Sequence, residues 1–214
     1  NCNFINNKAT GTAGEMGSAG DGGAVHFTGD GTVTNCNFTG NTATGDDGGA
    51  VHFTGDGTVS NCTFVGNTAG RSGGGAVYFS DTGIVTNCNF INNKATGGSI
   101  YGGAIWIYSG TVTNCNFTDN SADRGGAIRF SGTGTVKNCN FTNNKATGTG
   151  NYDGGGAVYL QGTGSLTNCN FTNNTASGDG GAIRFSGSGN VSNCNFADNK
   201  ATGTNSWGGA IMFV

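Results

Sequence analysis

The 214-residue sequence contains no proline, only two methionines and two tryptophans, and only 10% of its residues are charged. Its formal net charge is −3 and it has no run of basic residues, which argues against a nucleic-acid-binding surface. No apolar stretch is long enough to cross a membrane. The sequence also lacks any C-x-x-C pair or Cys/His cluster. We therefore expect no nucleic-acid partner, no membrane span in this segment, no metal and no cofactor.

What the sequence does contain is a repeat with a period near 26 residues. The motif N-C-x-F-x-x-N-x-A occurs eight times, beginning at Asn1, Asn35, Asn61, Asn87, Asn114, Asn138, Asn168 and Asn193. A second motif, G-G-A-V/I, also occurs eight times, from Gly22 to Gly208. All 14 phenylalanines fall in two slots, eight in C-x-F and six in G-G-A-x-x-F. A glycine-rich polar chain is often disordered, but a disordered chain would not keep this phasing.

Each repeat contains three short stretches in which apolar and polar residues alternate. In the first full repeat, Val25 and Phe27 share one face and His26 lies on the other. The second stretch has Val33 between two threonines, and in the third Phe38 shares a face with the cysteine two positions before it. A helix is disfavoured because glycine and β-branched residues dominate. The pattern predicts an all-β parallel β-helix with three short strands per coil and about seven to eight coils. Residues 1–214 then form a single repeat domain.

Stacking of the repeats predicts continuous core columns. The first strand contributes Val25, Val51, Val77, Ile105, Ile128, Val158, Ile183 and Ile211, and the second contributes Val33, Val59, Val85, Val112, Val136, Leu166 and Val191. Cysteine and phenylalanine columns come from the third strand. We place two asparagine columns at turns, one before each cysteine and one in F-x-x-N, because asparagine tolerates the left-handed conformation and stacked amides can hydrogen-bond. Insertions collect between N-x-A and the next G-G-A, so long loops should share one edge.

The eight cysteines leave two alternatives open. Stacked positions lie roughly 4.8 Å apart, which is within disulfide range, so bridges between adjacent coils are feasible. Side chains on neighbouring parallel strands point the same way, however, and this favours free thiols that act as small buried hydrophobes.

The motifs G-G-A-I/V and F-x-x-N together resemble the repeats of the chlamydial polymorphic outer membrane proteins and of adhesin-like surface proteins of bacteria and methanogenic archaea. F-x-x-N is met at Phe4–Asn7, Phe38–Asn41, Phe64–Asn67, Phe90–Asn93, Phe117–Asn120, Phe141–Asn144, Phe171–Asn174 and Phe196–Asn199. This resemblance implies a right-handed parallel β-helix that is extracellular or at the cell surface, with a role in adhesion or envelope structure.

One outward column is rich in aromatic and basic side chains and is our candidate ligand or partner surface. It is the middle residue of the first strand: His26, His52, Tyr78, Trp106, Arg129, Tyr159, Arg184 and Met212. The variable loops beside it add Tyr101, Tyr152 and Trp207. Aromatic rings stack on sugar faces and arginine donates to hydroxyls, so a glycan-binding module is one interpretation. The structural alternative is that these side chains only shield a sheet.

Two further outward columns carry weaker signals. The second strand presents Thr-x-Thr-like pairs at Thr32/Thr34, Thr58/Ser60, Thr111/Thr113 and Ser165/Thr167, interrupted by Ile84, Lys137 and Asn190. They resemble the face of ice-binding proteins, although threonine is also a common exposed strand residue. The third strand presents N-F-T sequons at Asn37, Asn116, Asn140 and Asn170, which are candidate N-glycosylation sites.

Enzymatic function is disfavoured. Polysaccharide-cleaving β-helices need convergent carboxylates, whereas the acidic residues here fall mostly in turns and the first-strand column contains none. The chain starts within one repeat and stops within another, so we expect a slice of a longer array whose open strand edges favour end-to-end self-association. The sequence thus predicts a non-enzymatic structural or adhesive protein, either an adhesin-like segment or the building block of an extracellular fibre.

Overall fold

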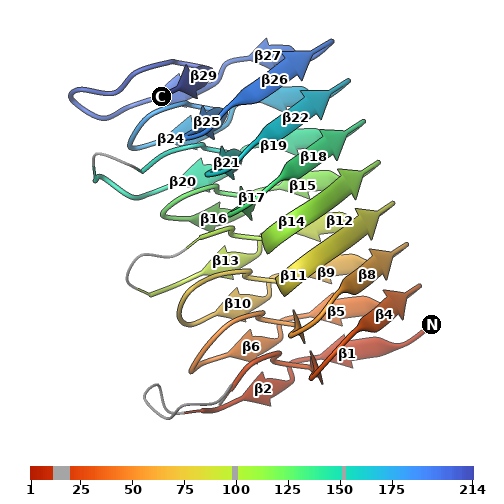
Figure 1. Cartoon of the computed structure of the whole chain (residues 1–214). Coiled ribbons are helices and arrows are strands. Elements are labelled where there is room, and N and C mark those ends of the chain that lie inside the picture. Colours follow the sequence, from red (N-terminus) through yellow and green to blue (C-terminus); the bar gives the residue numbers. More distant parts are fainter. Residues whose placement is uncertain (12–19, 98–100, 151–152) are drawn as a thin grey trace.

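The computed structural model describes residues 1–11, 20–97, 101–150 and 153–214. Those residues form a β-solenoid in which successive coils stack along one axis (Figure 1). They include no helix, and hence none that could cross a membrane. The predicted fold class, a right-handed parallel β-helix, is confirmed by the parallel strand pairing together with the family match reported below.

Three parallel sheets run along the solenoid. The first, here called the NF sheet, contains β1 (Asn3–Ile5), β5 (Asn37–Thr39), β9 (Thr63–Val65), β12 (Asn89–Ile91), β15 (Asn116–Thr118), β19 (Asn140–Thr142), β23 (Asn170–Thr172) and β27 (Asn195–Ala197). The narrow sheet contains β2 (Lys8–Ala9), β6 (Thr42–Ala43), β10 (Thr68–Ala69), β13 (Lys94–Ala95), β16 (Ser121–Ala122), β20 (Lys145–Ala146), β24 (Thr175–Ala176) and β28 (Lys200–Ala201).

The third, the wide sheet, joins two of the predicted strands. The G-G-A-V/I motif leads into β3 (Val25–Phe27), β7 (Val51–Phe53), β17 (Ile128–Phe130), β21 (Val158–Leu160), β25 (Ile183–Phe185) and β29 (Ile211–Phe213). The next segment forms β4 (Gly31–Thr34), β8 (Gly57–Ser60), β18 (Gly134–Lys137), β22 (Gly164–Thr167) and β26 (Gly189–Ser192). In two coils both segments form one strand, β11 (Val77–Thr86) and β14 (Ile105–Thr113).

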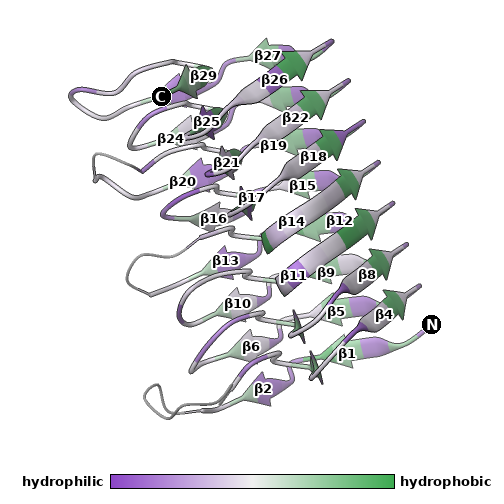
Figure 2. Cartoon of the chain, in the orientation of Figure 1, coloured by the Kyte–Doolittle hydropathy of each residue, from purple (hydrophilic) through white to green (hydrophobic). Residues whose placement is uncertain are grey.

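Equivalent repeat positions pair with one another throughout the solenoid. Phe38 pairs with Phe64, and Val25 pairs with Val51, so hydrophobic and hydrophilic positions recur from coil to coil (Figure 2). The three predicted strands are present. The two-residue strand at N-x-A, such as Thr42–Ala43, was not predicted, and it supplies the narrow sheet. The described parts of the loops that follow the narrow sheet lie at the same corner of the solenoid, as the insertion pattern predicts (Figure 1).

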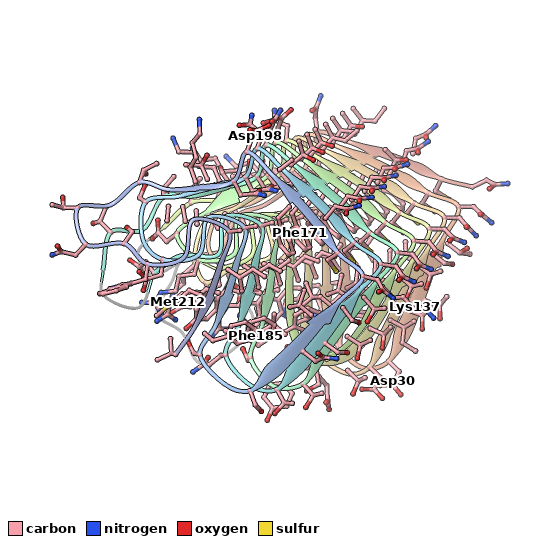
Figure 3. The ribbon with its side chains drawn as sticks, turned by 90° about the horizontal axis from the view of Figure 1, so that it is seen from above. Asp30, Lys137, Phe171, Phe185, Asp198 and Met212 are labelled. Carbon is pink, nitrogen blue, oxygen red and sulfur yellow. The ribbon has the colours of Figure 1, made fainter. Side chains whose placement is uncertain are left out.

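The predicted columns form a single core. Seen along the axis, Phe171 and Phe185 point into the interior, Asp30, Lys137 and Asp198 lie at outer corners, and Met212 lies on the side of the long loops (Figure 3). From Phe4 to Phe196, successive rings of the NF sheet stack with centroids 4.7 to 4.9 Å apart. All eight cysteines are free thiols, so the free-thiol alternative holds. The Sγ of Cys62, for example, donates to the carbonyl oxygen of Ser60 at 3.1 Å.

The two asparagine columns have different roles. The asparagine before each cysteine from Cys36 to Cys194 adopts the predicted left-handed conformation, with φ of 54° at Asn61 and 55° at Asn114. The F-x-x-N asparagine does not, which corrects that part of the prediction. The left-handed residue is the one before it, for example Asp119 at φ 57°. The asparagine itself, such as Asn120, is fully buried, and its stacked amide forms the predicted ladder because the corner turns its side chain inward.

The G-G-A motif is required by close backbone packing. Gly48, the first glycine of its repeat, has φ of 67°, which an L-residue rarely adopts. A Cβ on the second glycine, Gly49, would lie 2.0 Å from the carbonyl oxygen of Gly75 in the next coil. The alanine that follows, Ala50, is fully buried. The motif therefore lets adjacent coils approach closely at this corner.

Replacement of Phe117 by alanine tests the core. Its ring is fully buried between Phe90 and Phe141, so Phe117→Ala should lower the free energy of unfolding by roughly 3–5 kcal/mol. Chemical denaturation followed by circular dichroism measures this loss. Ile5→Ala, at a side chain that is 61% exposed, is the control. A loss below about 1 kcal/mol for Phe117→Ala would show that this ring is not part of the core.

Replacement of Asn120 tests the buried ladder. The Nδ2 of Asn120 donates to the carbonyl oxygen of Phe90 and to Oδ1 of Asn144, and its Oδ1 accepts from the backbone N–H and Nδ2 of Asn93. Because Asn120→Ala removes four buried hydrogen bonds, it should cost about 4 kcal/mol in denaturation experiments. Asn140→Ala, in an exposed amide ladder, is the matched control and should cost under about 1 kcal/mol. Equal losses in the two variants would contradict a special role for burial.

Candidate functional site

Two side-by-side columns of residues lie on the outer surface where the long loops meet the wide sheet. The first-strand column comprises His26, His52, Tyr78, Trp106, Arg129, Tyr159, Arg184 and Met212. The loop column is the residue immediately before each G-G-A motif: Asp21, Asp47, Gly73, Tyr101, Arg124, Gly154, Asp179 and Trp207. From Gly73 to Asp179 its members are joined by parallel β-bridges. The loop column is therefore continuous from coil to coil over this range.

The N-terminal half of the first-strand column is a stack of rings. The centroids of His52 and Tyr78 are 4.9 Å apart and those of Tyr78 and Trp106 are 4.3 Å apart, with planes within 7° of parallel. The rings of His26 and His52 are 4.8 Å apart but tilted by 47°. Most ring faces in this half are thus already in contact with another ring.

The C-terminal half places arginines against aromatic rings. The guanidinium carbon of Arg129 lies 4.0 Å from the ring centroid of Tyr101, and that of Arg184 lies 5.5 Å from Tyr159. The Nε of Arg184 lies 3.6 Å from Oδ2 of Asp179. Burial lowers the pKa of Arg129. Each of these contacts joins a first-strand residue to its neighbour or to the loop column.

Burial limits which column residues can reach a ligand. Arg129, Tyr159 and Arg184 are buried, with Arg184 only 2% exposed, and His52 is 4% exposed. His26, Tyr78, Trp106 and Met212 are partly exposed. Strand alternation correctly places all eight on the outer side of the sheet, but it carries no information about the loops packed over them. A ligand surface along this column stays a prediction, confined to its exposed members. Tyr152 lies outside the described residues.

Three carboxylates converge at the N-terminal end of the loop column, which turn chemistry alone did not predict. The backbone N–H of Asp47 donates to Oδ1 of Asp21 at 3.2 Å, and Oδ2 of Asp21 lies 3.8 Å from Nε2 of His52. Burial, together with the charges of Asp46 and Asp21, raises the pKa of Asp47 to about 7. Burial lowers the pKa of His52 to about 4, and burial and then the charge of Asp47 raise the pKa of Tyr78.

A groove of about 470 Å³ lies between the loops of the C-terminal coils. Its lining residues are Thr149, Gly150, Ser177, Gly178, Asp179, Gly203, Thr204, Asn205, Ser206 and Trp207. Trp207 is 68% exposed, and its backbone N–H donates to Oδ1 of Asp179 at 2.9 Å. The groove combines an exposed aromatic ring with hydroxyl, amide and carboxylate groups. The sequence identifies Trp207 only as a loop aromatic, because the groove itself depends on loop packing.

The other two outward columns lie where strand alternation puts them. In the second-strand column, Thr58 pairs with Ile84. Residues other than threonine therefore interrupt the column at positions equivalent to the threonines. The sequon residues Asn37, Asn116, Asn140 and Asn170 are exposed and form an amide ladder, for example from Nδ2 of Asn140 to Oδ1 of Asn116 at 2.9 Å. Their glycosylation, like ice binding, stays a prediction.

Replacement of Arg184 tests whether the two columns form a packed layer. Arg184→Ala leaves the partly buried Asp179 carboxylate without its partner and opens a space beside Tyr159. The free energy of unfolding should fall by about 3 kcal/mol, as measured by chemical denaturation. Arg71→Ala, at an exposed loop arginine, is the control and should change it by no more than about 0.5 kcal/mol. Equal effects would mean that the column contributes no packing.

Comparisons with known proteins agree with this architecture. No curated protein and no solved structure was found to match the chain. The family model of the Chlamydia polymorphic membrane protein repeat matches residues 168–186, which confirms the resemblance seen in the motifs. The family model described as the right handed beta helix region matches residues 1–163. Since that match covers more than half of the sequence, the chain belongs to the right-handed β-helix family.

Proposed function

We propose that this chain is a non-enzymatic segment of an adhesin-like protein at the cell surface, in which the coils form a rigid rod and the loop edge holds a partner. The match to the polymorphic membrane protein repeat supports a surface, adhesin-like repeat protein. The observation that carries the proposal is the pairing of equivalent repeat positions along all three sheets, which is maintained past the single bulge between β11 and β14. Such a solenoid holds its loops at fixed positions along one edge.

The groove beside Trp207 is the best candidate for the partner site on that edge, and its chemistry favours a carbohydrate. Exposed tryptophan offers a flat apolar face on which a sugar ring can stack. Asp179, Asn205 and Ser206 line the same groove and supply acceptors and donors for sugar hydroxyls. By contrast, Arg129 and Arg184 are committed to contacts within the column.

The arrangement of carboxylates supports a binding function rather than catalysis. Glycoside hydrolysis uses a pair of carboxyl groups that face each other across the scissile bond. Among the described residues that line the groove, Asp179 is the single carboxylate, and it accepts the Trp207 backbone N–H. Asp21 and Asp47 lie together at the other end of the solenoid, where both are buried. This placement suits retention of a sugar better than its cleavage.

A glycan microarray probed with the fluorescently labelled chain tests the carbohydrate partner. We expect binding to a defined set of glycans, and Trp207→Ala should weaken that binding by about tenfold or more because the stacking face is lost. Tyr108→Ala removes another exposed aromatic, outside the groove, and should leave binding unchanged. Absence of glycan binding, or equal effects of the two variants, would count against the carbohydrate site.

Electron microscopy of the same material separates the adhesin-like role from the second candidate, a fibre. The equivalence of the coils favours a fibre. The strands of any coil can pair in the same register with the strands of a coil from another copy of the chain. Single rods of fixed length would support the adhesin-like segment, whereas continuous filaments would support self-association into a fibre.

A further inference from the structure

The cluster of Asp21, His26 and His52 is a set of potential metal ligands that lies apart from the proposed glycan groove. Each residue offers one ligand atom, and these atoms all lie within 4.8 Å of one another. The three side chains come from two adjacent coils, since Asp21 precedes β3, His26 lies in β3 and His52 lies in β7. The cluster lies at the opposite end of the chain from the Trp207 groove. Two imidazoles and one carboxylate form the donor set that borderline divalent ions such as Zn²⁺ prefer.

The orientation of the two imidazole rings favours a shared ligand. The other neighbouring rings of the first-strand column are nearly parallel, at 7° for His52 with Tyr78 and 5° for Tyr78 with Trp106. Parallel stacked rings direct their nitrogens along parallel lines. His26 and His52 instead are tilted by 47°, which allows nitrogens from both rings to converge on one point.

The buried histidine also has unused binding capacity. His52 is 4% exposed, and its Nδ1 is buried with no hydrogen-bond partner among the described residues. Its Nε2 lies 3.8 Å from Oδ2 of Asp21, which is beyond hydrogen-bond range. A buried polar ring without partners is costly unless something binds it.

The carboxylate of the cluster is held in place by its neighbour. The backbone N–H of Asp47 donates to Oδ1 of Asp21, which leaves Oδ2 directed toward His52. Such outer contacts are typical of metal-binding carboxylates and fix their orientation. Asp46 and Asp47 also place two more carboxylates nearby, which attracts cations.

We propose that Asp21, His26 and His52 bind one divalent transition-metal ion of the zinc class, which joins the first two coils. Ligand atoms at about 2 Å from a tetrahedral zinc are roughly 3.3 Å apart, so the side chains move inward by about 1 Å on binding. Three protein ligands leave a fourth position for water. The hard ions Ca²⁺ and Mg²⁺ prefer oxygen ligands and do not compete for this site.

Isothermal titration calorimetry with Zn²⁺ alone tests the site, using a tag-free chain in which the exposed Cys2 and the partly exposed Cys194 are replaced by serine to remove the accessible thiols. We expect one Zn²⁺ per chain, unaffected by excess Ca²⁺. Asp21→Asn and His26→Gln should each weaken binding by about tenfold or more. Asp30→Asn, at an exposed aspartate outside the cluster, should leave the affinity unchanged. No Zn²⁺ binding, or binding unaffected by Asp21→Asn and His26→Gln, overturns the proposal.

Two further measurements distinguish ligation by this cluster from ligation by cysteine. Co²⁺ should give the absorption spectrum of nitrogen and oxygen ligation, and an intense cobalt–thiolate band would place the ion on cysteine instead and overturn the proposal. Zn²⁺ should raise the melting temperature of the parent chain more than that of the His26→Gln variant, because the variant binds Zn²⁺ more weakly. His26 is partly exposed, so this variant retains the fold even if His52→Gln does not. If the chain binds no glycan on the microarray, the interpretation of these metal-binding measurements does not change.

Discussion

The stacking distance between coils is the constraint on which the rest of this molecule depends. Parallel strands pair at roughly 4.8 Å, so every buried side chain must pack against the equivalent side chain of the next coil at that distance. Flat rings satisfy this condition by stacking, as Phe64 does on Phe90 at 4.9 Å. An amide satisfies it by donating to the next amide, as Asn67 does to Asn93 at 2.9 Å. A thiol satisfies it because it is small and accepts the neighbouring backbone N–H, as Cys88 does from Cys62. The composition of the repeat follows from this one distance.

The same constraint separates the invariable parts of a coil from the variable ones. At the G-G-A corner, backbone approaches backbone so closely that a Cβ on Gly75 would lie 2.0 Å from the carbonyl oxygen of Gly103. The loop after the narrow sheet can vary in length and sequence, since it lies outside the coil (Figure 1). Chemical variety therefore concentrates there and in the adjacent first-strand column, where histidine, tyrosine, tryptophan and arginine occupy equivalent positions. Both candidate sites lie on this edge.

The repeat alone predicted the solenoid and the core columns and favoured free thiols over disulfides, because each depends only on which residues recur and on which face they lie. It did not predict the narrow sheet, since two residues such as Lys145 and Ala146 are too short to show an alternating pattern. The repeat assigned the left-handed conformation to the asparagine of F-x-x-N, whereas the residue before it adopts that conformation. The two positions are hard to separate by sequence because asparagine is common at both. The repeat also did not predict the contacts of Asp21 with His52 and of Asp179 with Arg184. They depend on how loops of different lengths fold back over the sheet, which no periodicity encodes.

The direction of the hydrogen bonds between coils has a mechanical consequence. The bond from the Asn41 backbone N–H to Oδ1 of Asn67, like the backbone bonds of the three sheets, joins one coil to the next and so lies along the solenoid axis. A pulling force along that axis passes through all interfaces in series, so each interface carries the whole force and the weakest one separates first. A force across the axis is instead shared by all coils together. Under tension, such a rod therefore fails first at one interface between coils, whereas the covalent backbone that runs around each coil keeps that coil intact.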